Sequence, residues 1–447
     1  MRSEIYTKIV FVLMLVMFVS IFFFARFFIS IGFILIILFS FFNKEVFKVF
    51  KNNKSLQFLL LSAIMINIGI IYASFASGNL NIKSILGFSN PVFIFLYICS
   101  ASYFLSKNIK YANYLLNFYL SIVVIFSLYA LIRYVLHMDF VVSQIYFGIH
   151  GGSVIQSIVA LTFPFSAVVI IGKAIRIPNM MSKILMFTAG LLVIFIDLFV
   201  NRSKAGYVIE FVVFIYYSFI ALKYFSFKNN KLCIKRLITI VTCCIVIISI
   251  IFGVVYKFSG IFHYRLQTSV EESQVFFNQD YNNTDARKQY ETSTGLRLLY
   301  YSSSFKVLRE YPKLYILGCP YLTNTTDVIE CTKILINKNQ RLRDDPRVVN
   351  DGIMAHDEFV NYIFRAGIIA GISLLLCFVA FFVEARWLDY RNRVYFRVLI
   401  LAMFIGCLFD YFFTTQIMVI LFANLTAIFL SQRKYENKKD CNAINNS

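Results

Sequence analysis

The chain has 447 residues, of which 59% are hydrophobic and only 15% charged, and its mean hydropathy is +0.73. An ordinary soluble domain is about 25% charged. The 51 Phe and 28 Tyr add more apolar surface than one globular core of this length can bury. The composition therefore excludes soluble enzymes and DNA-binding proteins and predicts a polytopic membrane protein. The net charge of +20 agrees with this class, because membrane proteins retain Lys and Arg on their cytoplasmic loops.

Apolar runs recur along the chain at lengths close to the width of a bilayer. A helix needs about 20 apolar residues to cross the hydrocarbon core. We therefore predict an all-α protein with about twelve transmembrane helices. The runs cover residues 9–25, 27–42, 55–76, 91–106, 112–135, 153–172, 184–200, 205–222, 237–256, 366–383, 398–414 and 416–431.

Basic residues gather in alternate connections between these runs. Examples are the segments 44–54, 223–236 and 386–397, whereas the short connections between them carry few cations. The positive-inside rule then predicts that both termini are cytoplasmic and that the long connection lies outside the cytoplasm. We divide the chain accordingly. Helices 1–9 occupy residues 1–256, the large external loop 257–357, helices 10–12 residues 358–431, and a cytoplasmic tail 432–447.

Two features of the large loop predict ordered structure. Between Leu296 and Tyr311, the residues Leu299, Phe305 and Leu308 recur at a roughly helical spacing with basic residues between them, and Pro312 follows. This pattern predicts an amphipathic helix at the membrane surface that ends before the proline. The loop also holds Cys319 and Cys331, which we expect to form a disulfide because the external compartment is oxidising.

Three carboxylates lie in or near apolar runs, where a charge costs about 2.5–3.5 kcal/mol even on the lenient insertion scale. They are Asp197, Glu210 and Asp410. Each is expected to face the interior of the bundle and to have a partner there. Such a carboxylate serves either as a tether between helices or in proton handling.

Cations and a histidine on the external side are the candidate site residues. Arg202 and Lys204 lie in the tight turn 201–206, and Arg297 lies in the loop. The positive-inside rule disfavours cations in a short external turn, so their presence needs a reason. We expect them to bind either lipid phosphate or a diphosphate substrate.

His356 stands where the loop re-enters the bilayer, and its imidazole can accept a proton near neutral pH. None of the four histidines has a second ligand at metal-binding spacing. We therefore expect no metal and no cofactor.

Three of these patches resemble the bacterial O-antigen ligases and O-antigen polymerases. Lys204 stands where that family has an arginine in a Ser-Arg-Gly/Ala-like turn, and Arg297 matches the loop arginine that precedes a Pro-x-x-x-x-x-Gly stretch, here 312–318. His356 with Gly367 and Gly371 is similar to the family's histidine and paired-glycine signature. The match in topology covers nearly the whole chain, whereas the match in sequence is confined to these patches.

Two residues depart from the family pattern. Asp357 replaces the usual asparagine, and its negative charge favours a protonatable His356. Lys204 replaces the arginine, which weakens bidentate phosphate binding there and leaves the neighbouring Arg202 as a substitute.

The resemblance implies an enzyme of the bacterial inner membrane with its site facing the periplasm. It would transfer a glycan from undecaprenyl diphosphate to an acceptor sugar hydroxyl, without metal or nucleotide sugar and with inversion. His356 would take the proton from the hydroxyl, while Arg297 and Arg202 or Lys204 would hold the leaving diphosphate. The acceptor would be a carrier-linked repeat unit in a polymerase or lipid A core in a ligase. Membrane lipids and a chain-length regulator are further expected partners, and nucleic acid is not.

Two other classes fit less well. A lipid-linked oligosaccharide flippase would also be basic and polytopic, but transporters use broken helices at internal repeats, and the chain has 18 Gly, 6 Pro and no visible repeat. A peptidoglycan polymerase uses an external carboxylate, whereas the loop of this chain offers a histidine with cations. Polymerase is slightly favoured over ligase, because Arg365 stands where the family's ligases often have Glu.

Overall fold

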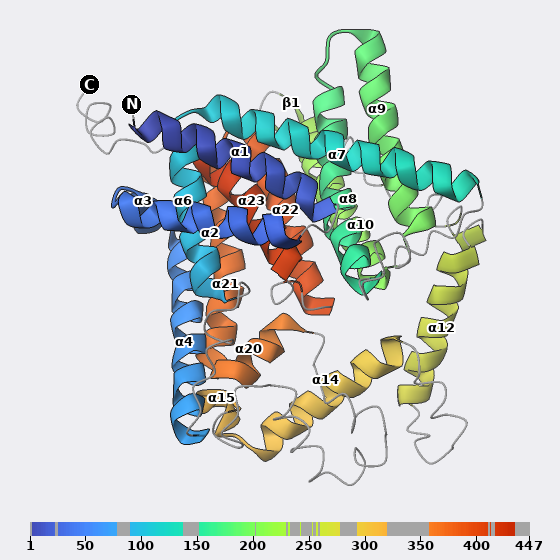
Figure 1. Ribbon diagram of the computed structural model, residues 1–447. Coiled ribbons are helices and arrows are strands. Elements are labelled where there is room, and N and C mark those ends of the chain that lie inside the picture. The colour runs from blue at the N-terminus through green and yellow to red at the C-terminus, as the bar shows by residue number, and fades with distance from the viewer. Residues whose placement is uncertain are drawn as a thin grey trace.

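The computed structural model describes most of the chain and is almost wholly helical in that part (Figure 1). One pair of two-residue antiparallel strands, β1 (Phe227–Lys228) and β2 (Lys231–Leu232), follows the helix α10. The described residues are 2–22, 26–77, 90–136, 152–201, 203–228, 231–232, 242, 253, 256–257, 260–277, 293–319, 357–409, 412 and 416–433.

Eleven of the twelve predicted apolar runs form helices. The remaining run, 237–256, lies almost wholly outside the described residues. The helices are α1 (Arg2–Phe22), α2 (Arg26–Phe42), α4 (Lys54–Ser77), α6 (Pro91–Ser106), α7 (Ile109–Val135), α8 (Gly152–Ala174), α9 (Met180–Phe195) with the π-helical turn η1 (Ile196–Val200), α10 (Lys204–Ser226), α21 (Ile368–Glu384), α22 (Tyr390–Phe409) and α23 (Gln416–Ser431).

Six helices within the described residues are long and apolar enough to cross a membrane. They include α1, α4, α7 and α22, while five more apolar helices such as α23 are shorter. In Figure 1, α1, α2 and α7 run roughly horizontally, whereas α4, α21 and α8 run roughly vertically. Length and composition thus support the transmembrane character, and the count of twelve spans stays a prediction.

The remaining elements connect the bundle or form its lower end in Figure 1. Short α3 (Val46–Lys51) precedes α4, and the 3-10 turn η2 (Ala385–Trp387) follows α21. The predicted loop contributes α12 (Gly260–Phe277), α14 (Ser293–Glu310) and α15 (Leu314–Leu317), and α20 (Glu358–Ala366) follows it. These four helices lie together at one end of the molecule, which we call the loop end (Figure 1).

Several helices begin at an Asn or Asp that satisfies an otherwise unpaired backbone N–H group. The side chain of Asn90 accepts a hydrogen bond from the N–H of Val92 at 3.0 Å, and Asp357 accepts one from Val360 at 2.9 Å. Such caps stabilise a helix by about 1 kcal/mol. The same arrangement starts α7 at Asn108 and α9 at Asn179.

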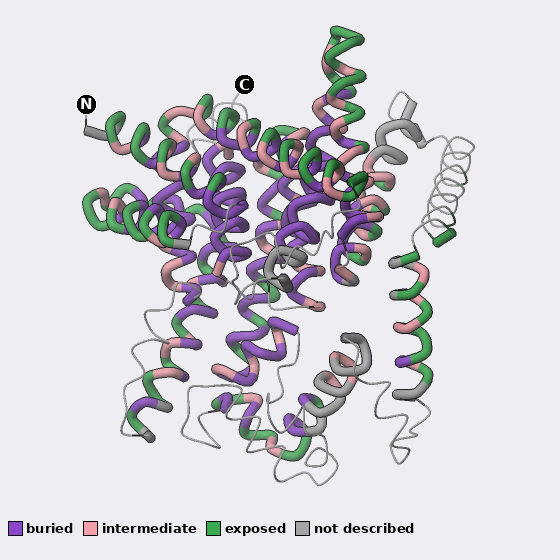
Figure 2. Tube along the Cα trace, turned by 45° about the vertical axis from the view of Figure 1, so that its right-hand side comes forward, coloured by how far each residue is buried: buried purple, intermediate pink, exposed green. Residues whose placement is uncertain are grey.

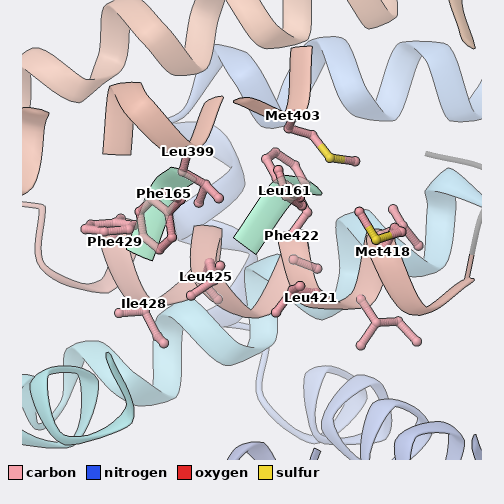
Figure 3. Packing of buried hydrophobic residues seen from close by; sticks show 14 of the residues in the cluster. Leu161, Phe165, Leu399, Met403, Met418, Leu421, Phe422, Leu425, Ile428 and Phe429 are labelled. Carbon is pink, nitrogen blue, oxygen red and sulfur yellow. The ribbon is translucent and has the colours of Figure 1, made fainter. Parts of the chain in front are cut away.

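The core centres on α23, whose residues from Ile417 to Ser431 are all buried. A helix that is apolar on every side needs neighbours on every side. Figure 3 shows Phe422 and Phe429 of α23 packed among side chains of α8 and α22, including Phe165 and Leu399. Figure 2 shows the same pattern at a larger scale, with buried residues gathered in the bundle and exposed ones along its outer helices.

Helices α4 and α21 pack antiparallel, and buried polar groups fix their register. The Ser62 hydroxyl donates to the carbonyl of Ala370 at 2.9 Å. At the other end of α21, the Glu384 carboxylate accepts the Lys54 N–H and, at 2.6 Å, the Ser55 hydroxyl. Glu384 thus binds the N-terminus of α4, where the helix dipole favours negative charge. Arg433, which follows α23, lies 4.0 Å from the same carboxylate.

We predict that Glu384→Gln lowers the free energy of unfolding by about 1.5–3 kcal/mol, because hydrogen bonds to a buried charged group contribute about that much. Glu45→Gln is the matched control. Glu45 is exposed and pairs with exposed Lys48, so its loss should leave the free energy of unfolding nearly unchanged. Unfolding of the purified protein in mixed micelles measures both. Equal stability of the two variants would contradict the role of Glu384.

Candidate functional site

The predicted amphipathic helix exists as α14, and it ends at Glu310, two residues before Pro312. Of its three predicted apolar positions, Leu299 has a side chain outside the described residues, and the other two differ in exposure. Leu308 is buried as expected, together with Val307, but Phe305 is 57% exposed. The reason is that α14 packs on one side against α15 and α20, so the positions that meet those helices are buried whatever the spacing of the apolar residues.

A second, small hydrophobic core joins α14 to α15 and α20. Val307 and Leu308 of α14, Leu314 of α15, and Val360 and Phe364 of α20 are all buried in it. Burial of one such side chain stabilises by about 1.5–3 kcal/mol. This core holds α14 against α20, where the chain leaves the loop.

Two of the motifs noted in the sequence contact each other through their backbones. Gly318, which ends the Pro312–Gly318 stretch, and Gly367 both have positive φ, at 70° and 83°. A Cβ atom at Gly318 would lie 2.8 Å from the N atom of Ala366, and one at Gly367 would overlap the carbonyl of Ile316. The N–H of Cys319 donates to the carbonyl of Phe364 at 2.5 Å. Glycine is therefore required at both positions, both for its conformation and for the close approach.

Tyr301 connects α14 to the start of α20. Its hydroxyl oxygen lies 3.2 Å from Oδ2 of Asp357 and also hydrogen-bonds the carbonyl of Leu408 near the end of α22. One phenol has a single proton for these two acceptors. When Asp357 is protonated, its own O–H donates to Tyr301, and the phenol donates to Leu408. Three segments far apart in the sequence thus meet at one hydroxyl.

Burial and charge shape the protonation of this group. Burial raises the pKa of Asp357, while hydrogen bonds from Val360 N–H and Tyr301 oppose the rise. Burial, and then the Asp357 carboxyl, also raise the pKa of the Tyr301 phenol, with Arg297 acting in the opposite direction. Tyr301 is therefore a neutral donor at physiological pH. Arg297 lies four residues before Tyr301, on the same face of α14, and is half-buried.

The turn between η1 and α10 is held by Asn201 and Ser203. Oδ1 of Asn201 accepts the Ser203 N–H at 3.3 Å, and its carbonyl accepts the Tyr207 hydroxyl at 2.8 Å. The Ser203 hydroxyl accepts the Gly206 N–H at 3.2 Å and so caps α10. The backbone of Lys204 begins α10, and its side chain is not described.

Two of the predicted buried carboxylates face the interior, as expected. Asp197 on η1 is fully buried, and Glu210 on α10 is 2% exposed. Their carboxyl groups are within hydrogen-bonding contact of each other. Asn201 also donates its amide to Oδ1 of Asp197 at 2.6 Å. The predicted partner is thus present for these two carboxylates, and the third, Asp410, lies outside the described residues.

Several predicted residues lie outside the described part of the chain, namely His356, Arg202 and Cys331. The described residues therefore bring Arg297 to Asp357 through Tyr301, but they do not include the histidine that precedes Asp357. Cys319 is disulfide-bonded. Its pairing with Cys331 stays a prediction, as do the roles of Arg202 and Lys204.

Within the described ranges, no three His, Cys, Asp or Glu side chains gather in a way that could hold a metal ion. Metal independence itself stays a prediction.

Two residues of this region did not emerge from the sequence, Tyr301 and Asn201. The spacing of Tyr301 four residues after Arg297 puts both on one helix face, which is a usable signal once α14 is predicted. Its acceptors on α20 and α22 follow only from the tertiary packing. Asn201 is the first residue of the cationic turn 201–206, and its amide bonds to Asp197 four residues earlier in the chain.

No known protein-family model matches this chain, and no curated protein shows significant sequence similarity to it.

We predict that Gly367→Ala detaches α15 and the following turn from α20, because the new methyl group would overlap the Ile316 carbonyl at a strained φ. Amide hydrogen exchange at Gly318 and Cys319 should rise at least tenfold while exchange in α23 stays unchanged. Gly260→Ala is the control, since no atom of the described residues lies within 4 Å of a Cβ there. Unchanged protection at Cys319 in Gly367→Ala would show that this contact does not hold the loop end.

Proposed function

We propose that this protein is a membrane glycosyltransferase that moves an undecaprenyl-diphosphate-linked glycan to an acceptor sugar hydroxyl, most consistent with an O-antigen polymerase. The observation that carries the proposal is the contact between α14 and the start of α20. It brings Arg297, Tyr301 and Asp357 into one cluster, next in the chain to His356. A diphosphate-binding cation and a proton acceptor are the two groups that this transfer requires.

The proposed reaction takes place at the periplasmic face of the bacterial inner membrane. His356 accepts the proton of the acceptor hydroxyl as its oxygen attacks the anomeric carbon. The bond from that carbon to the diphosphate breaks on the opposite side, so the configuration inverts. Arg297, with Arg202 or Lys204, neutralises the undecaprenyl diphosphate that leaves.

The described contacts support distinct roles for the neighbouring residues. Asp357 caps α20, and Tyr301 fixes the Asp357 carboxyl, so together they orient the backbone from which His356 extends. The small core of Val307, Leu308 and Phe364 keeps α14, and with it Arg297, in place. Reacting atoms must approach to about 3–3.5 Å, which demands this kind of rigid support.

We expect His356→Ala and Arg297→Ala each to lower polymer formation at least a hundredfold, because each removes a group that acts in the transition state. The measurement is the ladder of carrier-linked glycan formed from purified lipid-linked repeat units. Controls are His263→Ala and Arg309→Ala, which remove a histidine packed against Tyr256 and an exposed arginine at the far end of α14. A normal ladder from either site variant would overturn the assignment, and transfer to lipid A core alone would indicate a ligase.

Activity should fall as the pH drops through roughly 6–6.5, where an unperturbed histidine takes up a proton and ceases to be a base. The raised pKa of Asp357 acts in the opposite direction, because protonation of Asp357 removes a negative charge that favours the imidazolium and so shifts the fall in activity to lower pH. Initial rates against pH measure this, with His263→Ala again as the control. EDTA should leave the rate unchanged, and a loss restored by a divalent ion would show that metal neutralises the diphosphate.

A further inference from the structure

The pair formed by Asp197 and Glu210 differs from two other buried carboxylates of this protein, Glu384 and Asp357. Glu384 accepts a backbone N–H and a hydroxyl, and Asp357 accepts a backbone N–H. Among the described residues, no donor group hydrogen-bonds either carboxyl oxygen of Glu210, and the side chain is 2% exposed. The group in contact with it is the carboxyl of Asp197.

Two ionised carboxylates in contact inside an apolar bundle are excluded on energetic grounds. Even one charge at this depth costs about 2.5–3.5 kcal/mol, and a second like charge beside it adds strong repulsion. Carboxyl pairs held this close share one proton. The proton also supplies the missing donor, because an O–H on one partner can donate to the other.

The hydrogen bonds decide which partner holds the charge. Oδ1 of Asp197 accepts the Asn201 amide at 2.6 Å, a bond that favours the ionised form. No donor on a described side chain or backbone group favours the ionised form of Glu210. The proton therefore belongs on Glu210, and the single negative charge belongs on Asp197.

Several charged side chains on the helices that pack against η1 and α10 contact groups other than Asp197 and Glu210. Arg133 at the end of α7 donates to Tyr129, and Lys173 at the end of α8 donates to Asn117. On α12, Glu271 accepts from Gln267, Glu272 is buried, and the His263 ring packs against Tyr256. On α22, Arg397 donates to the carbonyl of Phe382. Among the described side chains, none of these cations exerts a resolved effect on Asp197 or Glu210.

We propose that Asp197 and Glu210 form a buried proton-binding site in which Glu210 carries one proton at neutral pH and donates it to ionised Asp197. The site adjoins the turn that starts α10, because the side chain of Asn201 connects the two. Its NH2 group donates to Asp197, and its oxygen accepts the N–H of Ser203. It also lies on η1, and π-helical turns frequently occur at functional sites. The proton thereby links the charge inside the bundle to the conformation of that turn.

The proposal predicts a specific pH dependence of stability. In the unfolded chain both carboxyls are ionised above about pH 5.5. Folding therefore takes up one proton, and the unfolding equilibrium constant rises about tenfold for each pH unit above that value. The stabilisation is present at low pH and is lost as the pH rises through the value at which the folded pair releases its proton.

Reversible unfolding of the purified full chain in mixed micelles, from about pH 6 to pH 8.5, tests this linkage. Glu210→Gln and Asp197→Asn each supply an amide donor in place of the shared proton, so both should lose the tenfold-per-unit slope relative to wild type. Glu384→Gln is the control, because it replaces a buried carboxylate that already has donors, and it should retain the wild-type slope. Equal slopes in wild type, Glu210→Gln and Asp197→Asn would overturn the proposal.

Infrared spectroscopy of the wild type tests the same point without a variant. A protonated-carboxyl stretching band that persists at about pH 8, where exposed Asp and Glu are ionised, supports the site. A spectrum without that band overturns it. Stabilisation by added Na⁺ or Li⁺ at fixed pH, absent from Glu210→Gln, would show a metal cation between the carboxylates and would also overturn it.

Discussion

The close backbone contact between the turn at Gly318 and the turn at Gly367 governs the loop end of this protein. Without side chains at these two positions, α15 reaches α20, and Cys319 can donate to the Phe364 carbonyl. The small core beneath it then fixes α14, and α14 presents Tyr301 to Asp357. The relative position of Tyr301 and Asp357 therefore depends on that one contact.

The sequence predicted the helices better than the contacts between them. Runs of apolar residues identify helices because a backbone in an apolar environment must satisfy its own hydrogen bonds. Pro312 likewise predicted the end of α14, because proline has no N–H group to donate and its ring clashes with the preceding helical turn. Phe305 shows the limit, since its exposure depends on where α20 lies and not on its neighbours in the chain. Likewise, burial could be inferred for Asp197 and Glu210 separately, but their contact joins π-helical η1 to α10 and required the packing of both.

Buried polar groups give the apolar bundle its register. Apolar surfaces slide past one another at little cost, whereas a hydroxyl or carboxylate without a partner costs about 1–3 kcal/mol or more. Ser62 and Glu384 pin α21 to α4 at two points. The reciprocal amide bonds between Asn67 and Asn90, at 2.9 and 3.2 Å, do the same between α4 and the start of α6. Few polar residues are enough, because each permits a single alignment.

The burial of α23 on every side bears on how the protein is made. Helices emerge from the ribosome in chain order, and α23 follows the other described helices. Until it arrives, α6, α8 and α22 enclose a place that only Phe422, Phe429 and their neighbours will fill. The helices made earlier must therefore remain loosely associated during synthesis, and their final packing is a late event in biogenesis.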